Sequence, residues 1–216
     1  MKLKKIASLA LAGIMAVSML TACGEGGNGN NGEDVPPETV VTTGIADAAN
    51  GERSDYAKSL GITYTETNAL ANALQAAAAS AYKDSTLIEK AAGNGYAGVA
   101  AGEKKVVAKL EESLAGKFDA SKFNNWGSLT TDDVYKMVKV YTVGGSFDAK
   151  DAAAMVSQEL SKNEIVNSKM VLQNGQMVAH DSAEIAAVKI TSNDDSTKSA
   201  WVVAVVFTQT LSTANS

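Results

Sequence analysis

Three pairs of neighbouring carboxylates have side-chain types and a spacing that could support catalysis. They are Glu111-Glu112, Asp132-Asp133 and Asp194-Asp195. Hydrolysis of a glycosidic bond uses two carboxyl groups on opposite sides of the substrate. Each pair also has a local explanation: a solvated helix face, a helix start and a turn. A carboxylate-dependent hydrolase acting on glycans is therefore kept as an alternative, and no catalytic residue is assigned.

His180, followed by Asp181, is the one position where imidazole chemistry could start, because the chain has a single histidine. A serine triad also needs a nucleophile, an orienting carboxylate and an oxyanion hole, and no serine lies in a recognisable nucleophile turn. We therefore expect His180 to be a polar residue at a strand end. One histidine and one cysteine exclude zinc sites built from several such residues, so no metal and no cofactor are expected.

The stretch Gly93-Asn94-Gly95-Tyr96-Ala97-Gly98 matches the glycine spacing GxGxxG. The dinucleotide fingerprint requires a strand directly before this motif and a helix directly after it, so that backbone amides hold a pyrophosphate. The residues before Gly93 have a helical pattern instead. The stretch therefore predicts a flexible turn rather than a phosphate loop.

Trp126, beside Asn124 and Asn125, is the candidate ligand-binding group. An indole ring stacks on a sugar ring, and the two side-chain amides could bond sugar hydroxyls. The chain is 6% aromatic, which is less aromatic surface than carbohydrate-binding proteins usually show. A core tryptophan at the edge of a helical layer is therefore the favoured interpretation, and sugar binding by Trp126 is the alternative.

The N-terminal segment has the order of a secretory signal. Met1 to Lys5 is positively charged, and Ile6 to Leu20 is apolar but shorter than a membrane-spanning helix. The segment ends in Leu20-Thr21-Ala22-Cys23, which resembles a bacterial lipobox. The resemblance implies that Cys23 receives a diacylglyceryl group on sulfur and that the chain is cut after Ala22. Two acyl chains hold a protein stably in a membrane; the alternatives are a plain secretory signal and a short membrane anchor.

The charge balance limits the partners. The three signal lysines leave with the signal, which takes the formal net charge from −5 to −8. Nucleic acid binding requires clustered Lys and Arg, so nucleic acid is not an expected partner. The expected partners are the lipid membrane, through Cys23, and an envelope protein or glycan of unknown identity. The expected location is the outer face of the cell membrane.

The domain organisation follows from changes in composition. We expect a signal peptide at 1–22, the lipidated Cys23 with a flexible acidic tether at 23–55, a single domain at 56–211 and a disordered tail at 212–216. The Gly- and Asn-rich composition after Cys23 has too little apolar surface to fold. The remaining length suits one domain with one core.

Helical patterns fill the first part of the domain. Thr63 to Glu66 has capping-box spacing before a helix that ends near Tyr82. A shorter helical or irregular piece at 83–92 follows, then a helix at 103–115 with an apolar stripe and Gly116 at its end. The segment 130–141 has an N-cap and first-turn acids that favour a helix, although its residues are also strand-like. A further helix, capped by Asp148, ends near Lys162.

Strand patterns fill the last part. Residues 169–173 and 176–180 flank Asn174-Gly175, a strong hairpin signal. Residues 183–192 and 199–210 flank a second turn at 193–196. The last strand is apolar on both faces from Trp201 to Phe207, which is typical of a central strand. The sequence therefore predicts an α+β fold, with N-terminal helices packed on a C-terminal antiparallel sheet of about four strands.

The C-terminal pattern resembles the last hairpin of the cysteine-rich secretory (CAP) family. The resemblance rests on Glu184-Ile185-Ala186-Ala187-Val188, the Asp-Asp turn and the strand from Trp201 to Phe207, preceded by a helix at 152–164. It covers about 60 residues and implies an α-β-α sandwich. The cleft histidines and glutamates of that family have no match here, so no site residue is carried over.

We expect a membrane-anchored extracytoplasmic lipoprotein with a non-catalytic binding or interaction domain. The alternatives are a carboxylate-dependent envelope hydrolase and a pilin-like assembly subunit. A cleft with two close carboxylates and aromatic walls would favour the hydrolase. A long exposed apolar patch or an unpaired sheet edge would favour assembly, and a shallow polar surface would favour binding.

Overall fold

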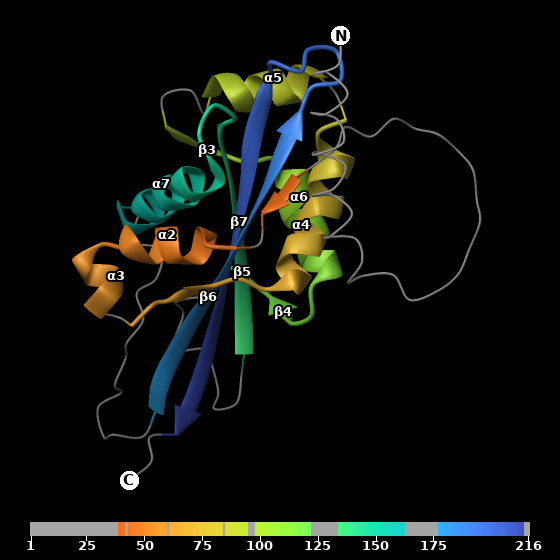
Figure 1. Ribbon diagram of the computed structural model, residues 1–216. Helices are drawn as coiled ribbons and strands as arrows, with labels where there is room; N and C mark the ends of the chain where they lie inside the picture. The colour runs from red at the N-terminus through yellow and green to blue at the C-terminus, as the bar shows by residue number, and fades with distance from the viewer. Residues whose placement is uncertain are drawn as a thin grey trace. The chain divides into compact units, whose positions relative to one another are not determined.

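The computed structural model describes residues 39–41, 43–59, 61–83, 85–94, 98–121, 134–162 and 177–213 (Figure 1). The chain divides into two units, Met1–Asp34 and Val35–Ser216, and all of the described residues belong to the second. Their elements, in chain order, are β1 (Thr39–Val41), α2 (Ile45–Gly51), α3 (Asp55–Ser59), β2 (Tyr64–Thr65), α4 (Asn68–Ala81), α5 (Ser85–Asn94), β3 (Val99–Ala101), α6 (Lys104–Ser113), β4 (Lys117–Phe118), β5 (Val134–Gly144), α7 (Ala149–Lys162), β6 (Met177–Thr191) and β7 (Ser199–Thr213).

One sheet of seven strands organises the described part of this unit. Its order is β1-β6-β7-β5-β3, with β2 also paired to β6 and β4 also paired to β5. The three long strands, β5, β6 and β7, are antiparallel, and β7 lies between the other two. The short pairings β2–β6 and β4–β5 are parallel. The central place of β7 confirms the expectation from its apolar sequence.

Helices cover both faces of the sheet, which gives three layers (Figure 1). On one face, α2 and α7 pack on the odd-numbered residues of β6 and β7, such as Ile185 and Val203. On the other face, α4, α5 and α6 pack on even-numbered residues such as Val188 and Val202. Successive side chains of a strand point to opposite faces, so a strand that is apolar at every position supplies both cores.

The α+β class predicted from the sequence is confirmed, and the sheet is larger than the four strands expected. Short strands that precede β5 in the chain, β1 to β4, extend it at both edges. These strands have two or three residues each, which is too short for a period-2 pattern to be recognised. The sheet is also not purely antiparallel, because β2 and β4 pair in parallel.

The helix expected at 130–141 is wrong, because residues 134–144 form β5. This strand pairs with β7 along its whole length, from Val134 opposite Thr210 to Gly144 opposite Ala200. Met137 and Val138 point to opposite faces, and both are buried. Burial on both faces stabilises the Val- and Tyr-rich segment as a strand, and this outweighs the local helix-start signal.

The expected tether at 23–55 is too long, because its last part belongs to the folded unit. Residues 39–41 form β1, and Ile45 of α2 is fully buried against α7. Arg53, the single arginine, donates from Nε to the Asn50 carbonyl (3.0 Å) and from Nη1 to the Ile62 carbonyl. At the other end, β7 continues to Thr213, beyond the expected boundary at 211.

The other helices lie close to the predicted segments. The helix expected after Thr63 begins one turn later: its N-cap is Thr67, whose hydroxyl accepts the Leu70 N–H (3.3 Å), because Tyr64 and Thr65 are used by β2. Asp148 caps α7 as expected, since its Oδ1 accepts the Asp151 N–H (2.8 Å). The segments 83–92 and 103–115 correspond to α5 and α6.

The second predicted hairpin is confirmed as β6–β7, with its turn at residues 192–198. The segments expected as separate strands at 176–180 and 183–192 are parts of the single strand β6. Residues 169–173, the other arm of the predicted Asn174-Gly175 hairpin, lie outside the described residues, so that hairpin stays a prediction.

Candidate functional site

The residues predicted to carry function lie mostly outside the described part of the chain. Cys23 and its signal segment belong there, and so do Trp126, Asn124 and Asn125. They remain predictions. His180 and Asp181 lie in β6, where they pair with Thr210 and Gln209.

The carboxylate pairs that the structure describes do not line the hollow described below. Glu111 and Glu112 are both exposed on α6, as expected for a solvated helix face. Asp194 and Asp195 lie in the β6–β7 turn, while 132–133 is outside the described residues. Within the described ranges, no three His, Cys, Asp or Glu side chains are grouped so that they could hold a metal ion. The one hollow described below has a single carboxylate and no aromatic side chain in its lining.

The glycine-rich stretch is preceded by a helix, as predicted. Gly93 and Asn94 are the last residues of α5, and the next described element is the strand β3. A helix before and a strand after is the reverse of the dinucleotide fingerprint. This geometry gives no helix N-terminus on which a pyrophosphate could lie.

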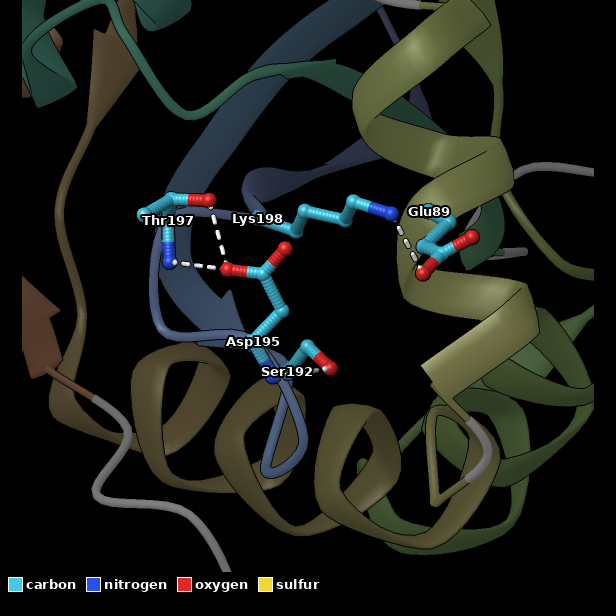
Figure 2. A network of polar contacts seen from close by, with 5 residues as sticks. All are labelled: Glu89, Ser192, Asp195, Thr197 and Lys198. Carbon is cyan, nitrogen blue, oxygen red and sulfur yellow. Dashed lines mark hydrogen bonds and ion pairs between the residues drawn. The ribbon is translucent and has the colours of Figure 1, made fainter.

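The β6–β7 turn carries the polar network shown in Figure 2. One oxygen of Asp195 accepts the Thr197 N–H (3.0 Å) and the Thr197 hydroxyl (2.5 Å), and these bonds lower the pKa of the Asp195 carboxyl. Lys198 bonds Glu89 of α5 at 2.6 Å, which raises the pKa of the Lys198 ammonium. The bonds close a turn and attach it to α5. A structural role in the turn therefore explains all four side chains, which are Glu89, Asp195, Thr197 and Lys198.

A second polar cluster lies buried between α2, β2 and α7. Ser157 is fully buried and its hydroxyl donates to the Ala49 carbonyl (2.7 Å). Burial raises the pKa of Tyr64, and burial together with the Glu159 charge raises the pKa of Tyr141 to about 12. Both phenols are therefore protonated at neutral pH. The cluster joins α2 to α7 and presents no accessible nucleophile.

The remaining candidate binding surface lies on the face of the sheet that carries α4, α5 and α6, in the half of that face that these helices do not cover. We call it the polar sheet face and define it by six side chains on the side of the sheet that those helices share. They are Thr65 of β2, Ser182 and Glu184 of β6, Thr208 and Thr210 of β7, and Lys136 of β5. Ser182 and Thr65 are exposed, and the other four are partly exposed. Every one of them carries a hydrogen-bonding group.

The strand register sets the geometry of this face. Ser182 lies opposite Thr208, and Thr208 lies opposite Lys136. Directly opposite side chains have Cβ atoms roughly 5 Å apart, and alternate residues along a strand, such as Thr208 and Thr210, are separated by about 7 Å. The result is a grid of hydroxyls, with a carboxylate at Glu184 and an ammonium at Lys136.

Lys136 is held in place at the edge of the grid. Its Nζ donates to the Ala115 carbonyl (2.8 Å) and lies 6.0 Å from the centre of the Phe118 ring. A Cβ at Gly116, where φ is +133°, would stand 2.8 Å from the Lys136 side chain. The positive φ favours glycine at this position, whereas the flexible lysine stem could shift to make room for a Cβ.

A change from apolar to polar side chains along two strands marks this face in the sequence. From Trp201 to Phe207, β7 is apolar at every position and buried, and after Phe207 the same face continues with Thr208 and Thr210. On β6 the same change separates Ala186 from Glu184. The two changes occur at neighbouring levels of the sheet, where the helix layer ends.

The sequence matches no protein-family model, and searches of curated proteins and of solved structures find no match. The likeness of the last hairpin to the cysteine-rich secretory family therefore stays a prediction from the residues. Among the described residues, no helix is long and apolar enough to cross a membrane.

Proposed function

We propose that this chain is an extracytoplasmic lipoprotein, anchored through Cys23, whose α+β domain binds a glycan of the cell envelope on its polar sheet face. The observation that carries the binding proposal is the row Ser182–Thr208–Lys136, three hydrogen-bonding side chains on directly paired strands. Hydroxyls donate and accept hydrogen bonds, as sugar hydroxyls do. A grid of such groups is complementary to the hydroxyls of a polar polymer.

The composition of the surface favours a glycan over a protein partner. Energetically important contacts in protein interfaces are centred on aromatic or apolar side chains that become buried. In the described ranges, Val134 is the only exposed large hydrophobic side chain, at 38% exposure. Single hydroxyl contacts are weak, and a repeating polymer compensates for this by engaging several sites at once.

A binding assay with insoluble cell-wall glycan tests this function. We expect the full-length protein in detergent to sediment with the glycan, and Ser182→Ala combined with Thr208→Ala to weaken the binding at least tenfold. Ser80→Ala combined with Ser146→Ala is the matched control, because both serines are exposed elsewhere. Equal sedimentation of the two double variants would refute the assignment of the face.

Trp126 adds a separate prediction. Val134, the first described residue after its segment, pairs with Thr210 of the polar sheet face. If Trp126 stacks on a bound sugar, Trp126→Ala weakens glycan binding without changing the unfolding free energy by more than about 0.5 kcal/mol, as for a surface position. A core tryptophan would instead cost roughly 3 to 5 kcal/mol.

The anchor has its own test. The lipobox resemblance is the support for lipidation, and Cys23→Ala removes the sulfur that would carry the lipid. We expect the wild-type protein to incorporate labelled palmitate in cells, and the variant to lose the label and appear in the medium or remain unprocessed. A Cys23→Ala protein that stays in the membrane at its mature size would disprove the lipid anchor.

Assembly by strand addition is a second candidate, favoured by one specific observation. Met177–Ser182 of β6 pairs with β7 on one side, and the β2 pairing begins only at Ala183. Among the described residues, this stretch has no strand on its outer edge. If copies of the chain join here, Ala179→Cys should give disulfide-linked dimers under oxidation. A monomer at all concentrations would rule out assembly at this edge.

A further inference from the structure

A hollow opens at an interruption in the outer edge of the sheet. On β6, the pairing with β2 ends at Glu184 and the pairing with β1 begins at Ala187. Ile185 and Ala186 lie between these two pairings and line a hollow of about 230 Å³. Since one water occupies roughly 30 Å³ of liquid, the hollow has the volume of about seven waters. This suits a small molecule and is too small for a polymer.

The lining combines an apolar floor with a polar rim. Ile45, Ala71 and Ile185 form the floor, and all three are buried. Thr43, Glu66 and Asn68 belong to the rim. A ligand with a short apolar body and one polar end matches this division.

Glu66 is the one ionisable side chain in the lining, and its carboxylate has acceptor capacity left. Its Oε1 accepts the Ala46 N–H (2.8 Å), which fixes the carboxylate at the start of α2. An ionised carboxylate has about four acceptor positions. No ion pair joins Glu66 to a lysine or arginine of the described residues, and this includes Lys150, whose side chain lies beside Gly44.

We propose that this hollow binds a small organic ammonium compound, with the ammonium group on the Glu66 carboxylate and the alkyl part on Ile45 and Ile185. A charge-assisted hydrogen bond in a partly enclosed site contributes about tenfold to a hundredfold in affinity. The ammonium group provides the donors that Glu66 lacks, and the apolar part displaces water from the floor. This site is separate from the polar sheet face and does not depend on glycan binding.

The test uses n-butylammonium as the probe and 1-butanol as its uncharged counterpart. Methyl signals of Ile45 and Ile185 are followed by NMR in the full-length protein. We expect saturable shifts with n-butylammonium and at least tenfold weaker binding of 1-butanol. Equal binding of the two probes, or no response of either isoleucine to n-butylammonium, would overturn the proposal.

Two variants separate charge from shape. Glu66→Gln keeps an oxygen that can accept the Ala46 N–H, so the fold is retained, and it should weaken n-butylammonium binding at least tenfold. Thr43→Leu places an apolar side chain at the exposed rim and should block both probes. Glu112→Gln removes an exposed carboxylate on α6 and should leave both affinities unchanged. Unchanged binding by folded Glu66→Gln would refute the role of the carboxylate.

Discussion

The two halves of the sheet differ in what lies on them, although the same long strands form both. Near the β6–β7 turn, Val202 and Ile190 are buried under helices. Towards the other end of the same strands, Ser182 is exposed and Thr208 is partly exposed. A polar surface can therefore form on a sheet where its helix layer ends, without a specialised loop. The difference also separates residues that determine stability from residues proposed to bind.

The largest loss of stability is expected from a substitution that creates a cavity in the covered half of the sheet. Leu74 of α4 is fully buried against the sheet, so Leu74→Ala should lower the unfolding free energy by about 3 to 5 kcal/mol. Chemical denaturation measures the loss. Ser80→Ala, on the exposed side of the same helix, is the control and should change stability by less than about 0.5 kcal/mol. A loss below about 1 kcal/mol for Leu74→Ala would mean that the half is not tightly packed.

A somewhat smaller loss of stability is expected from a substitution in the covered half that would bring a side chain against the backbone. A Cβ added to Gly145 would collide with the Ser199 hydroxyl and the Ser199 carbonyl oxygen. Backbone atoms cannot turn away as a flexible side chain can, so Gly145→Ala should cost about 1 to 3 kcal/mol. In Gly51→Ala nothing lies within 4 Å of the new Cβ. The thermal midpoint should therefore fall for the first variant and not for the second.

Alkaline pH should weaken the covered half through Tyr82. Burial raises the pKa of the Tyr82 phenol from 10.0 to about 12. Below pH 10 both states hold the proton, so the stabilisation is complete. Between pH 10 and about 12 the unfolded state loses its proton first, so stability falls as the pH rises. Tyr82→Phe should reduce this slope in unfolding experiments from pH 9 to 12, and an unchanged slope would show that Tyr82 titrates normally.

The smallest effect on stability is expected in the open half. Ser182→Ala with Thr208→Ala should change the unfolding free energy by less than about 1 kcal/mol, the range of strand propensities. The same double variant is expected to lose glycan binding. A loss of stability as large as that of Leu74→Ala would remove the distinction between the two halves, because the hydroxyls would then be structural.

Sequence patterns that extend over a whole helix or hairpin predicted most of the fold. The α4, α6 and α7 helices and the β6–β7 hairpin follow from caps, apolar stripes and turn residues that lie close together in the sequence. The sequence predicts a helix at 130–141 because the helix-start signal there is local, whereas the pairing with β7 that makes 134–144 a strand involves residues 56 to 76 positions away. Tertiary contacts of this kind override local propensity.

The candidate site was less predictable from the sequence. Thr208 and Ser182 are ordinary strand residues, and only the register places them opposite one another. The hollow depends on where two short strands, β1 and β2, end on β6, and neither strand has a readable pattern. Glu66 was predicted to be part of a capping box for the following helix. It instead binds the Ala46 N–H of α2, a contact between residues 20 positions apart.

The early start of the folded unit, at β1, shortens the chain between the proposed lipid anchor and the domain. If Cys23 carries the lipid, the chain from there to Thr39 has 16 steps. Even fully extended, this length spans at most about 55 Å. With such an anchor, the domain would stay within this distance of the membrane, and the proposed glycan ligand would have to reach into that zone.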